Sequence, residues 1–215
     1  DMARASDMGP LPYNFRDVGL SLLTPLALPA GRVLRCGAID NSSWTALGRP
    51  HTVINLRQGS DTASFPDCAM LQLGAANDLE KYDTSDKTVS DWVMSVLRVI
   101  AAAEFPVLIH CRSGRDRTGV IVAAILSVLG LAEDDILAEF ALSEGADPAL
   151  LEQTLAPWRD AGGIASWTRG VNLAHVRARL AGDYVGHGAL DYDAAWRHAI
   201  KEERSYLCAR VHDLW

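Results

Sequence analysis

The sequence of 215 residues contains no apolar run long enough to cross a membrane. A membrane-spanning helix needs about 20 consecutive apolar residues. The best candidate, Val120–Leu131, is much shorter and is interpreted as a core helix of a soluble fold. The first residues, Asp1–Gly9, are polar and mixed in charge, unlike a secretory signal peptide. We therefore expect a cytoplasmic protein, and secretion by a route that needs no leader stays open.

Cysteine is also scarce. The four cysteines stand at wide and irregular spacing: Cys36, Cys68, Cys111 and Cys208. Zinc sites and disulfide frameworks are recognised by clustered or regularly spaced cysteines. The sequence therefore predicts neither kind of site.

Basic residues do not dominate the composition, because the net charge is -7 at pH 7 and the isoelectric point is near 5.3. A nucleic-acid partner is not expected, since binding to nucleic acid requires a basic face. The length and the 49% hydrophobic content suit one well-packed domain. We assign residues 1–215 to a single domain, in which residues 163–215 form a helical C-terminal portion with no recognisable motif.

Apolar segments alternate along the chain in a way that is typical of α/β proteins. Strands are expected near Val33–Cys36, Thr52–Leu56, Ala69–Leu73 and Val107–His110. Helices are expected between and after them, including Val89–Ala103 and, near the C-terminus, Asn172–Leu180 and Ala194–Val211. This alternation predicts a mostly parallel sheet with helices on both faces.

The most informative segment is His110–Gly119, which reads HCRSGRDRTG. A buried strand, Pro106–His110, precedes it, and an apolar helix that ends at Gly130 follows it. A strand-to-helix turn directs several backbone N–H groups at one point and adds the positive end of the helix dipole. The segment therefore predicts an anion site with a cysteine in its floor.

The side chains of this loop suit chemistry on a phosphate ester. At Cys111, the helix N-terminus and the nearby arginines would stabilise a thiolate. Arg117, six positions later, offers a planar charged fork to two phosphate oxygens. Thr118 carries a hydroxyl that can hydrogen-bond the sulfur. Asp116 could donate a proton to the leaving oxygen, although Arg115 and Arg117 lower the pKa of a carboxyl in this position.

This loop resembles the signature of the cysteine-dependent protein tyrosine phosphatases, which is Cys, five residues, Arg, Ser or Thr, and Gly. More narrowly, the chain is similar to the bacterial PtpB-like branch, whose members carry an NFRD segment and a loop that ends in GKDRTG. Asn14–Gly19 matches the first and Gly114–Gly119 the second. Three further segments resemble the branch: Gly31–Asp40, Val53–Asp61 and Glu139–Gly145. The resemblance covers residues 12–157.

Four positions depart from the pattern of the branch. Arg115 replaces a lysine, Cys36 a serine, Asn55 an aspartate, and Leu20 a common second glycine. None of them is the expected nucleophile or Arg117, so they bear on the choice of substrate more than on the chemistry.

The resemblance implies a protein-tyrosine-phosphatase-like fold and a two-step hydrolysis. A thiolate attacks phosphorus to give a cysteinyl-phosphate, and water then hydrolyses it, with an aspartate acting first as acid and then as base. Many relatives carry that aspartate in a Trp-Pro-Asp tripeptide, which is absent here. The branch implies the aspartate inside the loop, Asp116, with Asp78 or Asp83 as the alternatives. No metal and no organic cofactor is implied.

We therefore expect a phosphomonoester hydrolase in which Cys111 is the nucleophile, Arg117 the transition-state clamp and Asp116 the acid. Substrate contacts are expected from Arg112, Ser113, Gly114, Arg115, Thr118 and Arg16. For Arg16, a structural ion pair is the alternative. The expected substrate is phosphotyrosine, in a phosphorylated protein, or a multiply charged phosphate ester such as a phosphoinositide, nucleotide or metabolite, because Arg112 and Arg115 add positive charge.

A binding module is the alternative from another functional class. A pseudophosphatase would recognise phosphorylated partners and release them unchanged. This alternative stays open because the sequence does not settle which residue is the general acid. The intact Cys111 and Arg117 favour an enzyme.

Overall fold

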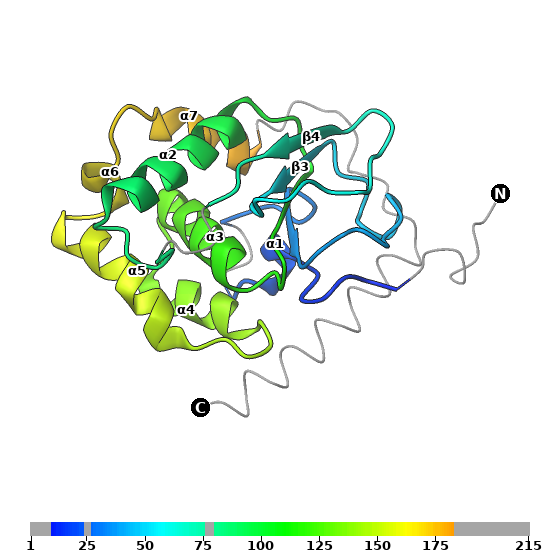
Figure 1. Ribbon diagram of the computed structural model, residues 1–215. Coiled ribbons are helices and arrows are strands. Elements are labelled where there is room, and N and C mark those ends of the chain that lie inside the picture. The colour runs from blue at the N-terminus through cyan, green and yellow to red at the C-terminus, as the bar shows by residue number, and fades with distance from the viewer. Residues whose placement is uncertain (1–9, 24–26, 76–79, 183–215) are drawn as a thin grey trace.

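A single five-stranded sheet organises the chain. The computed structural model describes residues 10–23, 27–75 and 80–182 (Figure 1). The strands are β1 (Arg16–Asp17), β2 (Val33–Cys36), β3 (Thr52–Asn55), β4 (Ala69–Gln72) and β5 (Val107–His110). Their order in the sheet is β1-β2-β5-β3-β4. Only β1 is antiparallel to its neighbour, so the predicted mostly parallel sheet is confirmed.

The register of the sheet brings the carboxyl ends of the central strands to one edge. His110, the last residue of β5, lies opposite Cys36 of β2 and Asn55 of β3. The four expected strands are present within one residue of their predicted ends. Strands β2, β3 and β5 are short runs of buried residues, whereas β4, at the edge of the sheet, is largely exposed. Strand β1, in the NFRD segment, was not expected. Cys111 therefore emerges at the centre of the sheet edge.

Seven helices complete the described residues. They are α1 (Val18–Ser21), α2 (Lys87–Ala102), α3 (Asp116–Leu129), α4 (Glu133–Ala141), α5 (Pro148–Asp160), α6 (Ile164–Trp167) and α7 (Leu173–Ala181). Local signals set their ends. The carboxylate of Asp86 caps α2 by accepting from the N–H groups of Thr88 and Val89, and α3 ends at Gly130, whose φ of 85° is left-handed.

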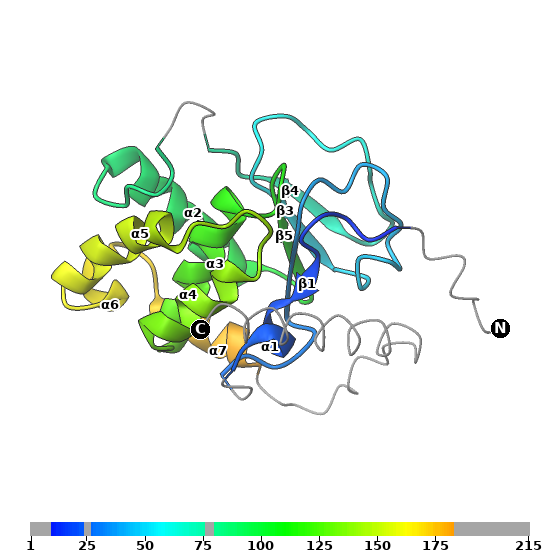
Figure 2. The same ribbon diagram turned by 90° about the horizontal axis from the view of Figure 1, so that it is seen from below.

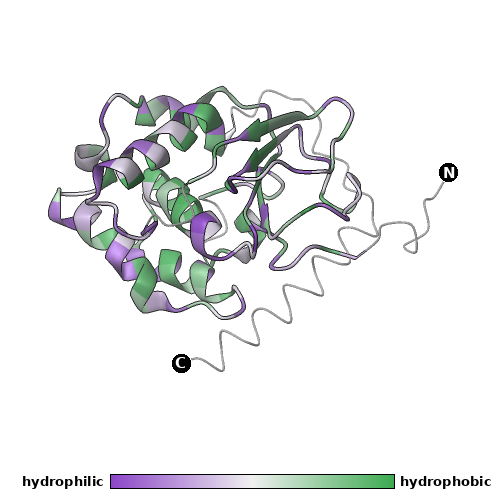
Figure 3. Ribbon diagram, viewed as in Figure 1, coloured by the Kyte–Doolittle hydropathy of each residue, from purple (hydrophilic) through white to green (hydrophobic). Residues whose placement is uncertain are grey.

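The main core lies between the sheet and the helices. Helix α3 is buried along most of its length and packs beside α2, α4, α6 and α7. It is coloured mostly as hydrophobic in Figure 3. Val176 and Leu180 of α7 are fully buried in the same core, so α7 packs in the core that lies on the helical side of the sheet. The expected helix Ala194–Val211 lies outside the described residues.

Loops cover the second face of the sheet. In Figure 2 the helices α2–α5 lie on one side of the strands, and the blue and cyan loops on the other. The core on this face consists of Phe15, Leu34, Cys36, Ile39, Leu47, Val53 and Leu108. The α/β class is confirmed, but in the described part of the chain the expected long helices cover one face only. The segments 37–51 and 56–68 are rich in Gly, Pro, Ser, Asn and Asp, which favour turns over helices.

Within residues 10–23, 27–75 and 80–182, no helix combines the length and the apolar character that a membrane crossing requires.

Candidate active site

Cys111 lies at the end of the central strand and at the floor of the strand-to-helix loop. It is 3% exposed, and its neighbour His110 is fully buried between β2 and β3. The helix α3 begins at Asp116, five residues after Cys111. Cys36, Cys68 and Cys111 are free thiols. Burial, and then the nearby Cys111, raise the pKa of the Cys36 thiol, so Cys36 stays protonated and is a poor nucleophile.

Three successive carbonyl groups of the loop accept hydrogen bonds from outside it. Arg112 O accepts from Ala38 N (3.1 Å), Ser113 O from Asn14 Nδ2 (2.8 Å) and Gly114 O from Arg35 Nη2 (2.9 Å). In a trans peptide the N–H group points away from the C=O group. The next three amides, those of residues 113–115, therefore point into the loop. Inward amides at a strand-to-helix turn suit the anion site that the sequence predicts.

Gly114 is required by both conformation and space. Its φ is +70°, and an added Cβ would lie 2.4 Å from the carbonyl carbon of Cys36. That neighbour is backbone of β2, which cannot move without disturbing the sheet. The glycine therefore permits the close contact between the loop and the adjacent strand.

Replacing Gly114 with alanine is expected to weaken the anion site and the fold together. We expect a loss of about 2 kcal/mol or more in the free energy of unfolding, from the left-handed φ and the backbone clash. Affinity for tungstate should fall more than about ten-fold, because the loop amides are displaced. Gly59→Ala is the matched control, since its Cβ would meet nothing within 4 Å. Denaturant titration and calorimetry measure both effects, and equal behaviour of the two variants would contradict the prediction.

The first turn of α3 carries the remaining residues of the expected site. Arg117 is half-buried there, while Arg112 is exposed and Ser113 is half-buried on the loop itself. The hydroxyl of Thr118 is buried and has no hydrogen-bond partner in the described part of the chain. Gly119 lets α3 approach α4, because an added Cβ would lie 2.5 Å from the ring of Phe140.

Asp116 lies at the start of α3 and accepts three hydrogen bonds. Its Oδ1 accepts from Tyr82 Oη (2.6 Å) and Arg115 Nε (3.1 Å), and its Oδ2 accepts from Arg115 Nη2 (3.3 Å). Burial raises the pKa of Asp116, but the hydrogen bonds from Arg115 and Tyr82 and the charge of Lys81 outweigh it, and the net pKa is lowered. Arg115 thus lowers the pKa of Asp116, as the sequence predicts. Tyr82 was missed, because a lone tyrosine in a polar segment carries no motif.

Of the two alternative acids, the structure describes Asp83 but not Asp78. Asp78 lies outside the described residues. Asp83 accepts hydrogen bonds from Ser85 N (3.0 Å) and Ser85 Oγ (2.5 Å), which lower its pKa. These contacts are typical of an Asp that stabilises a turn. Asp83 is therefore engaged in the local structure that precedes α2.

The contacts of Arg16 favour the structural ion pair over the expected substrate contact. Its Nε lies 2.8 Å from Glu139 Oε1, and its Nη2 donates to Glu139 O (3.0 Å) and to Ser143 Oγ (2.9 Å). Its partner is thus Glu139 on α4, while the adjacent Asp17 caps α1. The side chain is only 4% exposed, so Arg16 has the structural role that was its alternative.

Arg35 and Glu139 connect this buried pair to the loop. Glu139 Oε2 lies 2.6 Å from Arg35 Nη1, and Arg35 Nη2 donates to the Gly114 carbonyl. Burial lowers the pKa of Arg35 to about 10, which leaves it charged at neutral pH. We call Arg16, Arg35 and Glu139 the buried ion cluster. Through Arg35, the cluster binds the Gly114 carbonyl, one of the three outward-facing carbonyls of the loop. The sequence did not predict this cluster.

A second network supports the strand that precedes Cys111. His110 Nε2 lies 3.0 Å from Asp61 Oδ2, and Asp61 Oδ1 lies 2.5 Å from Arg57 Nη2. Arg57 Nη1 also lies 3.1 Å from Asp40 Oδ2. The hydrogen bonds from Arg57 and Thr62 lower the pKa of Asp40 to about 2. These contacts tie the loops of the second face to the sheet edge beside the loop.

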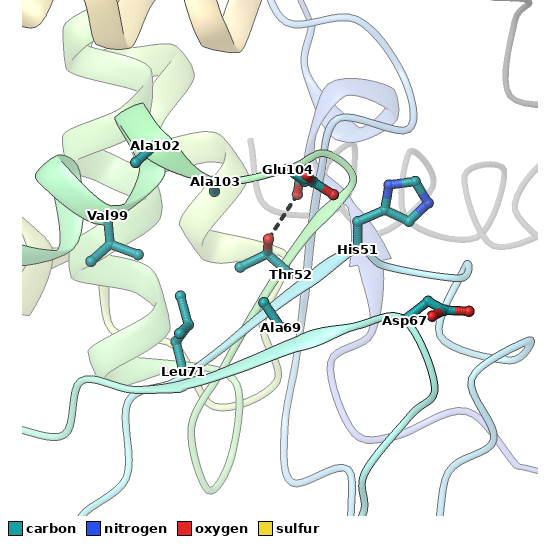
Figure 4. A pocket seen from close by; sticks show the side chains of 9 residues that line it. All are labelled: His51, Thr52, Asp67, Ala69, Leu71, Val99, Ala102, Ala103 and Glu104. Atoms are coloured by element: carbon teal, nitrogen blue, oxygen red, sulfur yellow. Dashed lines mark hydrogen bonds between the residues drawn. The ribbon is translucent and has the colours of Figure 1, made fainter.

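A separate groove lies at the other end of the strands. It has a volume of about 440 Å³ and is bordered by the first residues of β3 and β4 and the last turn of α2 (Figure 4). Thr52 Oγ1 donates to the carbonyl of Glu104 there (2.9 Å). The amino ends of parallel strands point away from Cys111, so this groove is distinct from the candidate active site. Within the described ranges, no three His, Cys, Asp or Glu side chains gather as a metal site.

Comparison with known proteins places this geometry in a family. The chain is 45% identical over 125 residues to the triple specificity protein phosphatase PtpB of Mycobacterium tuberculosis, covering 53% of this chain and 40% of the relative. It is 37% identical over 90 residues to a putative tyrosine-protein phosphatase of Cupriavidus necator, covering 41% of this chain and 30% of the relative. The chain thus spans less than half of the length of either relative.

Comparison with solved structures gives a partial likeness. The crystal structure of TpbA from P. aeruginosa superposes with a TM-score of 0.45 and 24% identity, covering 73% of this chain and 92% of that chain. The profile of the tyrosine phosphatase family matches residues 11–180, which include the NFRD segment, the loop and α3–α6. The chain therefore belongs to the tyrosine phosphatase family.

Proposed function

We propose that this protein is a phosphatase that hydrolyses phosphate monoesters through a cysteinyl-phosphate intermediate. The observation that carries the proposal is that three successive carbonyls of the loop after Cys111 are hydrogen-bonded outward, which turns the amides that follow them into the loop. Amides fixed in this way stabilise the equatorial oxygens of a phosphoryl group in the transition state. Family membership and the relatives' names support the same reaction class.

The loop can supply each group that the two steps need. In the first, the Cys111 thiolate forms a bond to phosphorus, the bond to the ester oxygen breaks, and Asp116 gives that oxygen a proton. In the second, water attacks phosphorus, Asp116 takes its proton, and the bond from phosphorus to sulfur breaks. The lowered pKa of Asp116 suits the second step, which needs a carboxylate. Thr118 offers its unpartnered hydroxyl to the sulfur.

The proposed substrates are phosphotyrosine and multiply charged phosphate esters. The side chains of Arg112 and Arg115 are at least one-third exposed, and Lys81 lies close enough to affect Asp116. Positive charge at the rim of the site favours substrates with a second anionic group. A reducing, cytoplasmic location suits a reactive thiol, because oxidation would inactivate it.

Phosphate release near pH 6 from a small aryl phosphate tests the proposal. The wild type should turn over and be blocked by vanadate. Arg117→Met should lower kcat/KM by about 10³-fold or more, because it removes the bidentate charge on the transferred group. Arg159→Met is the control: Arg159 is 54% exposed and pairs with Glu133 on the surface. Equal activity of the two variants would contradict the role of Arg117.

One observation favours a second function, that of a phosphate-binding module without turnover. In this structure Asp116 is bonded to Arg115 and Tyr82, and its pKa is lowered, which disfavours the protonated form that the first step uses. A phosphate-binding module without turnover would bind tungstate but release no phosphate. Turnover by the wild type would exclude it.

A further inference from the structure

We infer that Tyr82 is a positioning residue for the proposed reaction: its hydroxyl fixes the carboxyl of Asp116 beside the loop, and the helices α5 and α6 fix Tyr82. This inference rests on the proposed function. The segment that contains Tyr82 precedes α2 and is distant in sequence from the loop. Its contacts link the C-terminal helices to the group that handles the proton.

The ring of Tyr82 is held on all sides. The residue is 3% exposed, and its ring meets that of Phe140 edge to face, at 6.4 Å between centroids and 85° between planes. Phe140 is itself packed against Gly119 of α3. With the ring fixed, the hydroxyl has a fixed direction, and it donates to Asp116 Oδ1 at 2.6 Å. Short hydrogen bonds to a carboxylate are strong and directional.

The backbone around Tyr82 is bonded to α5 and α6. Thr154 of α5 donates its hydroxyl to the Tyr82 carbonyl (3.0 Å), and Thr84 donates its hydroxyl to the Thr154 carbonyl (2.8 Å). Trp167 of α6 donates its indole N–H to the Thr84 carbonyl (3.2 Å). Thr84 and Thr154 are fully buried, so these bonds do not compete with water. The position of Tyr82 therefore depends on helices that follow the loop in sequence.

The charges around Asp116 determine how loss of the hydroxyl would change its protonation. The groups that act on it are Arg115 from its own loop and Lys81 and Tyr82 from the segment before α2. Arg115 and Lys81 stabilise the carboxylate by charge, and Tyr82 stabilises it by donating a hydrogen bond. Burial and the carboxylate keep the pKa of Tyr82 far above its ordinary value, so the hydroxyl remains a donor. Removing it should raise the pKa of Asp116.

Tyr82→Phe removes the hydroxyl and keeps the ring, so the packing on Phe140 is retained. The test compares phenyl phosphate, whose leaving group needs a proton, with 2,4-dinitrophenyl phosphate, whose leaving group does not. We expect Tyr82→Phe to lower kcat on phenyl phosphate about ten-fold, a fraction of the full effect of an acid. On the dinitrophenyl ester the change should be less than about two-fold. The pH at which activity falls on the basic side should move upward.

A double-mutant cycle separates positioning from a structural role. In an Asp116→Asn background, Tyr82→Phe should add almost nothing, because the group on which it acts is gone. Thr154→Val, which removes the bond to the Tyr82 carbonyl, should show the same dependence on the leaving group. Thr52→Val is the control: it removes a buried hydroxyl that donates to a backbone carbonyl at the far end of the sheet. It should leave both the pH profile and the leaving-group dependence unchanged.

Two outcomes would overturn the inference. One is an equal loss on both esters, and the other is an equal loss with and without Asp116. Either would make Tyr82 a purely structural residue. Absence of turnover by the wild type on both esters is a different result: it overturns the proposed function, and the inference with it.

Discussion

Replacing Cys111 with serine is expected to abolish phosphate release from aryl phosphates, with a loss on the order of 10⁴-fold or more. The serine hydroxyl is a far weaker nucleophile than a cysteine thiolate, because it is almost never ionised at neutral pH. Serine is close to cysteine in size, so the loop and its amides should keep their positions. The variant should therefore still bind tungstate with an affinity close to that of the wild type.

Cys68→Ser provides the matched control for this change. Cys68 is a free, partly exposed cysteine just before β4, away from the loop. Its variant should retain full turnover. The measurements are phosphate release and calorimetric titration with tungstate for all three proteins. Turnover by the Cys111 variant above about 1% of the wild type would assign the reaction to another nucleophile.

Replacing Glu139 with glutamine is expected to destabilise the fold by about 3–5 kcal/mol, as is usual when one partner of a buried ion pair is removed. Glu139 is 2% exposed and neutralises two buried arginines, Arg16 and Arg35. The amide can accept one hydrogen bond from the pair but supplies no charge. Because Arg35 also holds the Gly114 carbonyl, tungstate affinity should fall with stability.

The pH dependence gives this prediction a definite sign. Burial raises the pKa of Glu139, but Arg16 and Arg35 outweigh it and bring the net pKa below its ordinary value of 4.5. A pKa that is lower in the folded state means that the unfolded chain binds the proton more tightly. The contribution of Glu139 is therefore present above pH 4.5 and is lost as the pH falls through the folded-state pKa.

Urea titrations at pH 7 and at pH 4 or below test this behaviour. The wild type should lose more stability between the two conditions than Glu139→Gln does. Glu152→Gln, on the exposed face of α5, should resemble the wild type at both. Equal stability of the two glutamine variants at pH 7 would show that the cluster contributes little.

The parts of the fold that sequence predicts are those specified by local pattern. The strand before Cys111 is a run of β-branched and apolar residues, and Gly130 ends the following helix in the left-handed conformation that glycine favours. The loop itself was predictable because the residues of the family signature stand at fixed spacing. Residues that are close together in the sequence are sufficient to specify such elements.

The parts that sequence missed depend on contacts between distant segments. Glu139 meets Arg35 across 104 residues and Arg16 across 123. Tyr82 meets Asp116 across 34 residues. None of these partners has a spacing that marks it, since each pair forms only when the sheet and helices have packed. The loop cover of the second face was missed for a related reason, because alternation of strands and helices does not specify where each connection lies.

The outward bonding of the three loop carbonyls has a consequence for protein engineering. The bonds that fix the loop come from Asn14, Arg35 and the backbone of Ala38, and they reach main-chain atoms only. The side chains at positions 112 and 113 take no part in these bonds. Under the proposed function, the loop backbone and the side chains that would meet the substrate are therefore separable. We expect that residues at these two positions can be exchanged to change substrate choice while the loop keeps its backbone bonds.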